Sequence, residues 1–183
     1  MAETTVTFGT RQRMTWEQYW DLPDDLRAEY SDGEVLVNPP PSVQHQQICR
    51  RLANLLDAQL PGAVVVEGAG WKLSGNEPRL RIPDVVVLRE QPAGDVVTEA
   101  PLVAVEVLST NRDADLVRKA VEYLDAGAGQ YWIVDPRDRE VAVFGAAEGG
   151  WEQLAKLTDQ NPEATVDVAP FGAARLTIGD ILT

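Results

Sequence analysis

The chain has 183 residues, of which 44% are hydrophobic and 25% are charged, and its formal net charge at pH 7 is −13. This length and composition suit an ordinary globular protein, and we expect a single domain over residues 1–183. Cys49 is the only cysteine and His45 the only histidine, which excludes a disulfide framework, a thiolate zinc site and a His-rich metal site.

The negative charge restricts the partners of the chain. It repels polyanions, so overall charge does not favour nonspecific binding to nucleic acid. Such binding needs a local basic patch or a metal that neutralises clustered acids. The candidates for a basic patch are Arg79, Arg81, Arg112, Arg118 and Lys119. The charge is therefore evidence against a nuclease, which any nuclease hypothesis has to answer.

Charges or prolines interrupt every apolar stretch, so none approaches the length of a membrane span. The first residues also lack the basic and apolar regions of a signal peptide. We therefore expect a cytoplasmic protein with no membrane partner.

The N-terminal part of the chain predicts short elements. Residues 1–13 have no clear periodicity and are expected to form a flexible or extended lead-in. Thr15 and Gln18 fit a capping box, which predicts a short helix through Trp20. A second helical turn is expected over residues 23–29.

A hairpin and a longer helix follow. Asp32 and Gly33 lie between strand-like flanks, which predicts a β-hairpin over residues 29–37. Residues 42–60 have the apolar spacing of an amphipathic helix, and Pro61 ends it. Its apolar face is expected to carry Ile48, Leu52, Leu55, Leu56 and Leu60.

The middle of the chain predicts three strands and a helix. Residues 64–67 and 71–73 indicate one strand, bent at a glycine between the two runs. Residues 81–88 and 102–109 are apolar, β-branched runs typical of buried strands. A helix is expected over residues 113–126.

The C-terminal part predicts mainly β-structure. Residues 130–135 and 140–144 indicate a hairpin, residues 151–157 a weak strand, and a final helical turn follows Gly179. The order of elements predicts an α/β domain with a central mixed β-sheet flanked by helices, preceded by an N-terminal helix and β-hairpin.

Two acids in the buried strand runs are the candidate site. Asp84 and Glu106 lie in or beside valine-rich segments, where an unpaired charge costs several kcal/mol, roughly. If the two strands are neighbours, the carboxylates converge, and a divalent cation would compensate them. In the alternative interpretation, Asp84 caps a turn and Glu106 pairs with Arg79 or Arg81 in a structural ion pair.

The predicted helix after these strands adds a lysine. Its apolar face is expected to contain Leu116, Ala120, Tyr123 and Leu124, widened by Val117 and Val121, with Arg118 pointing away. Lys119 lies at the edge of this face, from which its long stem can carry the ammonium toward the sheet and to a water beside the metal. The alternative is a solvent-exposed lysine on an amphipathic helix.

Three further residues are possible members of the site. Glu29 precedes the predicted hairpin and would add a third carboxylate, although its spacing alone is more typical of an exposed acid. Glu67 is a rival because it follows a valine run. His45 lies at the start of a predicted helix, which would aim it at a ligand or leave it exposed.

Several of these residues occur in a pattern that resembles a known superfamily. Pro83-Asp84, followed by Glu106-Val107-Leu108-Ser109, resembles the PD-(D/E)XK nucleases, and more closely the Uma-two family of putative restriction endonucleases. The resemblance covers roughly residues 14–145. Its other fragments are Met14-Thr15 with Tyr19, Glu29 before Asp32-Gly33-Glu34, Pro39-Pro40 before His45, Lys119 with Tyr123, Gly127, and Tyr131-Trp132-Ile133-Val134-Asp135-Pro136.

The resemblance implies a restriction-endonuclease-like fold with an acidic metal site. Asp84 and Glu106 would bind Mg²⁺, with Mn²⁺ as a substitute and the carbonyl of Val107 as a further ligand. The superfamily places a lysine two residues after the second acid, where this chain has Leu108. The family is taken to supply that lysine from the next helix, which implies Lys119, and Glu29 stands where the family has its early acid.

The functional hypothesis is a Mg²⁺-dependent endonuclease that hydrolyses DNA phosphodiester bonds. DNA binding is expected to be weak or selective because of the charge, and the tryptophans leave room for a homodimer surface. A second hypothesis is a catalytically weak or inactive module of the same fold that binds nucleic acid or a protein. A third is a metal-dependent hydrolase of smaller phosphoesters.

Overall fold

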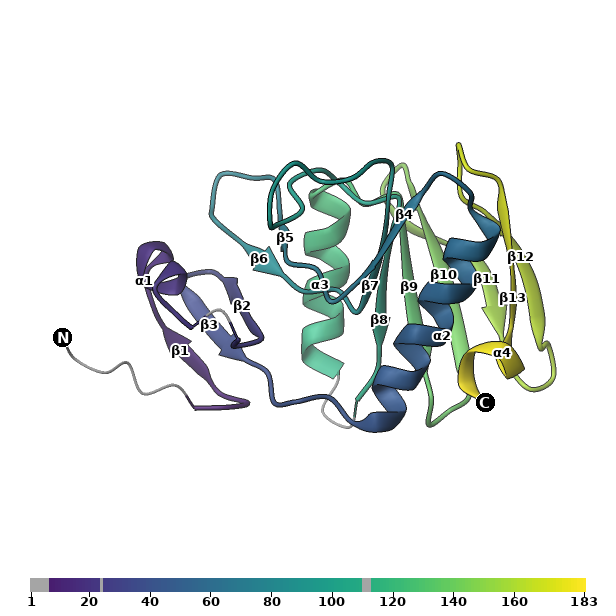
Figure 1. Cartoon of the computed structure of the whole chain (residues 1–183), viewed down its shortest axis with the longest axis horizontal. Coiled ribbons are helices and arrows are strands. Elements are labelled where there is room, and N and C mark those ends of the chain that lie inside the picture. The colour runs from purple at the N-terminus through teal and green to yellow at the C-terminus, as the bar shows by residue number, and fades with distance from the viewer. Residues whose placement is uncertain (1–6, 24, 110–112) are drawn as a thin grey trace.

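The computed structural model describes residues 7–23, 25–109 and 113–183 and has the mixed α/β architecture expected from the sequence (Figure 1). The helices in these residues are α1 (Trp16–Trp20), α2 (Val43–Gln59), α3 (Asp113–Asp125) and α4 (Ile178–Leu182). The strands are β1 (Arg11–Arg13), β2 (Ala28–Ser31), β3 (Glu34–Val37), β4 (Val64–Glu67), β5 (Trp71–Lys72), β6 (Leu80–Arg81), β7 (Val85–Leu88), β8 (Val103–Val107), β9 (Gln130–Asp135), β10 (Glu140–Ala147), β11 (Gly150–Leu157), β12 (Glu163–Asp167) and β13 (Ala173–Thr177).

The central sheet is mixed, as predicted. Its strand order is β11-β10-β9-β8-β7-β4, and all of its pairs are antiparallel except β8 with β9. Parallel neighbours need a crossover connection, and α3 supplies it between β8 and β9. The crossover fixes α3 on one face of the sheet, next to the strand that carries Glu106.

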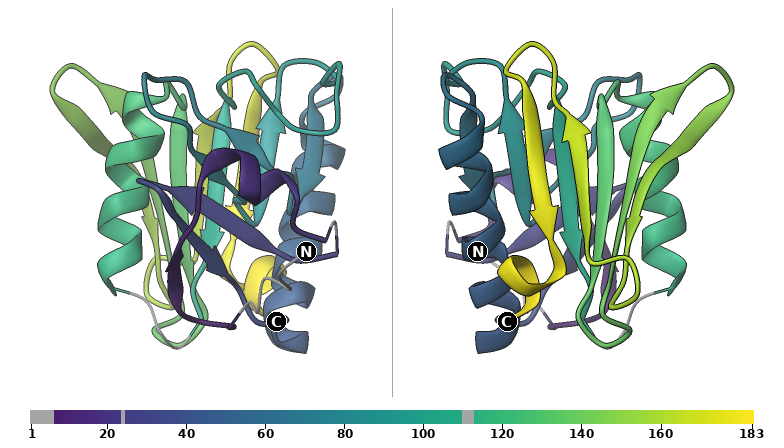
Figure 2. Two further views of the ribbon diagram at one scale, coloured as in Figure 1. Left: turned by 90° about the vertical axis from the view of Figure 1, so that its left-hand side faces the viewer. Right: turned by 90° about the vertical axis from the view of Figure 1, so that its right-hand side faces the viewer.

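The two long helices cover opposite faces of this sheet, which Figure 2 shows from two sides. On one face, α2 packs Leu52 and Leu56 into a core with Val85 and Val105, which β12, β13 and α4 extend. On the other face, Tyr123 of α3 lies in a second core that includes every other residue of the same strands, such as Val86 and Ala104. This split follows from the alternation of side chains along a strand.

A smaller sheet, of order β1-β3-β2-β6-β5, lies beside the central one. The predicted hairpin at Asp32 and Gly33 is confirmed, with φ angles of 54° and 75° as a tight two-residue turn requires. The helical turn expected over residues 23–29 is wrong at its end, because residues 28–31 pair with β3 and with Leu80 of β6. A single turn remains, closed by the hydrogen bond from the Leu26 N–H to the Pro23 carbonyl, and residue 24 lies outside the described residues. Residues 11–13 of the expected lead-in also form a strand, whereas residues 1–6 lie outside the described residues.

The run 81–88, expected to be one strand, is divided between the two sheets. Leu80 and Arg81 belong to the small sheet, and Val85–Leu88 belong to the central sheet. Asp84 therefore lies where the chain passes from one sheet to the other. Residues 64–67 and 71–72 are divided in the same way, so the single bent strand expected there is wrong.

The predictions for the longer elements are confirmed. Helix α2 has the buried face expected of it and begins after an N-cap at Ser42, and β9, β10 and β11 form the expected strands. The hairpin of β12 and β13 was not predicted from the sequence. No helix in the described part of the chain is both long enough and apolar enough to span a bilayer.

Candidate functional site

Strand register brings Asp84 and Glu106 together. Val85 pairs with Val105 in the antiparallel β7–β8 ladder. Asp84 directly precedes Val85 and Glu106 directly follows Val105, so both acids lie at the same end of this ladder. The Asp84 backbone N–H donates to the Val105 carbonyl at 2.9 Å, and the Asp84 carboxylate accepts from the Val107 N–H at 2.8 Å. Both acids are buried, with 6% and 7% of their surface exposed.

Asp84 is compensated by three hydrogen-bond donors rather than capping a turn. In addition to the Val107 N–H, Arg27 donates to its Oδ1 at 2.7 Å, and His45 Nε2 lies 3.2 Å from its Oδ2. Burial by itself raises the pKa of Asp84, but His45, the Val107 N–H and Arg27 outweigh burial and lower it. Asp84 is therefore held as a carboxylate.

Glu106 is less well compensated. The Lys119 ammonium donates to both of its carboxylate oxygens at 3.1 and 3.0 Å, and the Tyr123 hydroxyl donates to Oε1 at 2.7 Å. The cationic partner of Glu106 is therefore Lys119 and not Arg79 or Arg81, as the alternative interpretation had it. Burial, which Lys119 only partly offsets, raises the pKa of Glu106 to about 7, and the negative charges of Asp84 and Glu29 add to the effect.

Lys119 reaches the sheet from the second turn of α3. Its residue is 7% exposed, and its Nζ lies 3.0 Å from Glu106 and 3.0 Å from Glu29. Burial lowers the pKa of Lys119, but the two carboxylates outweigh burial and raise it, so the ammonium stays charged. The apolar face of α3 is narrower than predicted, because Val117 and Val121 are 70% and 55% exposed.

Glu29 belongs to the same cluster. It lies on β2, is 2% exposed, and accepts from the Ile82 backbone N–H at 3.0 Å and from Arg81 at 3.2 Å. Burial raises its pKa, but Lys119 and Arg81 outweigh burial and lower it. The interpretation of Glu29 as an exposed acid is therefore wrong, whereas its rival Glu67 is exposed.

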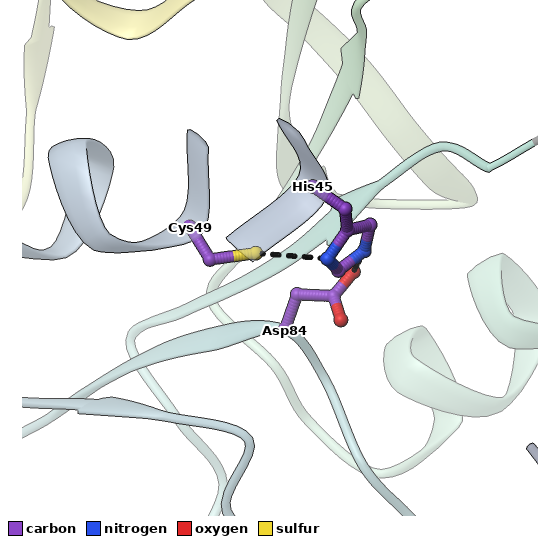
Figure 3. A group of neighbouring side chains, drawn as sticks. All are labelled: His45, Cys49 and Asp84. Atoms are coloured by element: carbon purple, nitrogen blue, oxygen red, sulfur yellow. Dashed lines mark hydrogen bonds and ion pairs between the residues drawn. The ribbon is translucent and has the colours of Figure 1, made fainter. Parts of the chain in front are cut away.

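The structure also places His45 and Cys49 beside Asp84, and Figure 3 shows the three side chains. His45 Nδ1 lies 3.5 Å from the Cys49 sulfur, while its Nε2 faces Asp84. Burial, and then the charge of Asp84, raises the pKa of the Cys49 thiol. Sequence reasoning left His45 open and missed Cys49, although their i, i+4 spacing on one helix placed them on one face.

A second ionic cluster adjoins the first. Arg81 donates to Glu122 at 2.6 Å, Arg118 donates to Glu122 at 3.0 Å, and the Ser31 hydroxyl donates to Glu122 at 2.9 Å. Arg118 and Arg79 also pair with Asp32. Every described candidate for a basic patch is therefore paired with a carboxylate, and the remaining candidate, Arg112, lies outside the described residues.

The oxygen ligands of this site suit a hard divalent cation. The carboxylates of Asp84 and Glu106, at the same end of the β7–β8 ladder, supply such ligands. Mg²⁺ is bound by one or two carboxylates together with substrate phosphates. Burial raises the pKa of Glu106, and the negative charges of Asp84 and Glu29 add to the effect, so a cation bound beside these carboxylates would stabilise the ionised form of Glu106. The residues present therefore fit a metal of this class.

Comparisons with known proteins identify the family of the chain and a solved structure of similar fold. The family model described as "Putative restriction endonuclease" matches residues 16–178. Among solved structures, the chain is similar to a putative nuclease of the family DUF820 from Anabaena variabilis, with 20% sequence identity and a TM-score of 0.73, over 92% of this chain and 97% of that one. No curated protein matches the chain in sequence. Since the family model covers most of the chain, the protein belongs to the Uma-two family of putative restriction endonucleases.

Proposed function

We propose that this protein is a Mg²⁺-dependent endonuclease that hydrolyses DNA phosphodiester bonds, with Mn²⁺ as a substitute metal. The observation that carries the proposal is a pair of buried carboxylates at one end of the β7–β8 ladder. Asp84 directly precedes β7, Glu106 lies on β8, and the Lys119 ammonium lies 3.0 Å from Glu106. Membership of a family described as restriction endonucleases supports it.

Each residue of the site has a separate task in this proposal. Asp84 and Glu106 would hold the Mg²⁺, with the Val107 carbonyl as a further ligand. When bound, the ion lowers the pKa of a coordinated water and neutralises charge on the phosphate. Lys119 orients the attacking water or stabilises the phosphate, and Glu29 keeps the ammonium charged and in place.

Lys119 takes the role of the lysine that the superfamily usually places where this chain has Leu108. Its ammonium enters from α3 instead of from β8, yet it contacts the acid two positions before Leu108. We also propose that residues 1–183 work as one domain, because Lys119 joins Glu29 of the small sheet to Glu106 of the central sheet.

The net charge of −13 limits how such an enzyme binds DNA. Arg79, Arg81 and Arg118 are paired with carboxylates and are not available to DNA phosphates. A metal ion therefore has to neutralise part of the negative charge of the site, and DNA binding is weak or selective. The homodimer stays a prediction: Trp20 is half exposed, whereas Trp151 packs in the α3-side core. The cytoplasmic location also stays a prediction.

Replacement of one metal ligand tests the proposal directly. We expect Glu106→Ala to reduce Mg²⁺-dependent cleavage of plasmid DNA by at least about 100-fold, because one of the two carboxylate ligands is lost. Glu140→Ala is the matched control, since Glu140 is a partly exposed strand glutamate paired only with Lys156 among the described ion pairs. Circular dichroism checks that both variants fold. Equal cleavage by Glu106→Ala and the wild type would refute the proposal.

The unusual origin of the lysine allows a second test. We expect Lys119→Met to lower cleavage by about 100-fold, and Leu108→Lys in the same chain to restore at least about a tenth of the wild-type rate, because it returns an ammonium to the usual position. Rates on supercoiled plasmid measure both effects. A Lys119→Met variant of undiminished activity would remove Lys119 from the mechanism.

One alternative function has its own support. Leu108 and the acidic surface favour a module that binds nucleic acid or protein without catalysis. Chelator-sensitive turnover of plasmid or single-stranded DNA would exclude this alternative, and a comparison of DNA with nucleotides would distinguish an endonuclease from a hydrolase of small phosphoesters.

A further inference from the structure

The only histidine and the only cysteine of the chain lie beside the same carboxylate. His45 and Cys49 occupy i, i+4 positions in the first half of α2, and Asp84, the residue before β7, faces them (Figure 3). One potential ligand atom from each residue lies within 4.8 Å of the other two, and all three residues are buried. The nuclease proposal uses neither His45 nor Cys49.

The three ligands form a set that Mg²⁺ does not prefer. An imidazole nitrogen, a thiolate sulfur and a carboxylate oxygen are ligands of Zn²⁺ and similar borderline cations, whereas Mg²⁺ takes oxygen. Ligands of a tetrahedral zinc, with bonds of about 2.0–2.3 Å, lie about 3.3–3.6 Å apart. The 3.5 Å separation of Cys49 Sγ and His45 Nδ1 already has this value.

Binding of one cation by all three residues requires a change in how Asp84 and His45 lie relative to each other. Asp84 now contacts Nε2, on the side of the imidazole opposite Cys49, so a bound cation requires the ring to turn or the carboxylate to approach Nδ1. Its partner Arg27 has 29% of its side chain exposed and can release Oδ1 toward solvent. The Val107 N–H can stay on Oδ2 and orient the carboxylate, as hydrogen bonds from outside the ligand set commonly do.

We propose that His45, Cys49 and Asp84 form a binding site for a borderline divalent cation of the Zn²⁺ class, with a water in the fourth position. The exclusion of a thiolate zinc site from the sequence rested on the count of cysteines, and it does not apply to a mixed N, S, O set. The site shares Asp84 with the proposed Mg²⁺ site but not Glu106 or Lys119. It therefore does not depend on nuclease activity.

Cobalt(II) is the probe of choice, because a Co²⁺–thiolate bond gives a charge-transfer band in the near ultraviolet and Cys49 is the only possible source of the thiolate. We expect one equivalent of Co²⁺ to produce this band in the purified chain, Zn²⁺ to bleach it, and excess Mg²⁺ to leave it in place. Cys49→Ser should abolish the band, and His45→Gln should weaken Co²⁺ binding at least about tenfold.

Glu106→Gln is the matched variant that separates this proposal from the proposed function. It should lose Mg²⁺-dependent cleavage and keep the Co²⁺ band, so failure of one proposal is distinguishable from failure of the other. Absence of a band in the folded wild-type chain with excess Co²⁺ would overturn the proposal. A band of unchanged strength and affinity in His45→Gln would also overturn it.

Discussion

Two buried ionic clusters lie side by side along α3 and differ in the number of cationic side chains that pair with each carboxylate. In the Glu122 cluster (Arg81, Arg118, Ser31 and Glu122), two guanidinium groups and a hydroxyl donate hydrogen bonds to one carboxylate. Burial raises the pKa of Glu122, but Arg81, Ser31 and Arg118 outweigh burial and lower it to about 2.

In the Glu106 cluster (Glu29, Glu106 and Lys119), two carboxylates share one ammonium. Arg81 and the Ile82 N–H also serve Glu29, so Glu106 has the weaker compensation, and burial raises its pKa to about 7. A buried carboxylate whose charge is fully compensated by cationic partners has a structural role, whereas a carboxylate whose charge is only partly compensated binds a metal ion or a proton more readily. The contrast explains why we place the chemistry at Glu106 and a structural role at Glu122.

Arg81 serves both clusters, and its removal is expected to have the largest effect on stability. Arg81→Met would leave Glu122 without its closest partner and Glu29 with Lys119 alone among its cationic partners in the described residues. Loss of one partner of a buried pair costs about 3–5 kcal/mol of unfolding free energy. Urea denaturation of Arg81→Met and the wild type measures this loss of unfolding free energy.

Arg139→Met is the control, because the Arg139–Asp159 pair is exposed at both side chains. Such a pair contributes less than about 1 kcal/mol. If Arg81→Met and Arg139→Met lose equal unfolding free energy, the buried ion pairs of Arg81 contribute no more to stability than an exposed pair, and the prediction is wrong.

Glu122→Gln is expected to have the next largest effect. The pKa of Glu122 is about 2 in the folded chain against 4.5 as its usual value, so ionised Glu122 stabilises the fold by about 3 kcal/mol above pH 4.5. This contribution is lost as the pH falls from 4.5 to 2. The stability deficit of Glu122→Gln should therefore be largest at neutral pH and vanish near pH 2, which urea titrations across this range would measure.

Glu106→Gln is expected to cost the least, and its pH dependence has the opposite sign. The folded chain holds the Glu106 proton more tightly than the unfolded chain does, so wild-type stability without metal decreases as the pH rises from 4.5 to about 7. The variant lacks this decrease, and at pH 8 it should be no less stable than the wild type. A clear loss of stability at pH 8 would contradict the weak compensation of Glu106.

The candidate site could be predicted in part because its residues carry local signals. Asp84 and Glu106 stand out as charges in β-branched runs, and the position of Lys119 at the edge of an apolar helix face indicates its direction. Glu29 carries no such signal, and the one local signal for Cys49 is its i, i+4 spacing from His45. Glu29 is buried only because β2 lies between β3 and β6, where Ile82 and Arg81 can reach it.

The sequence by itself determined the elements whose signals are local. The apolar spacing of α2, the Asp32-Gly33 turn and the valine runs of β7 and β8 each lie within a few residues, so the helix, the hairpin and the buried strands follow from the chain alone. Only the tertiary structure decided the division of residues 80–88 between two sheets and the meeting of Glu29 with Lys119. The physical reason is that strand pairing and ion pairing join residues far apart in the chain, and their partners are fixed by packing rather than by sequence spacing.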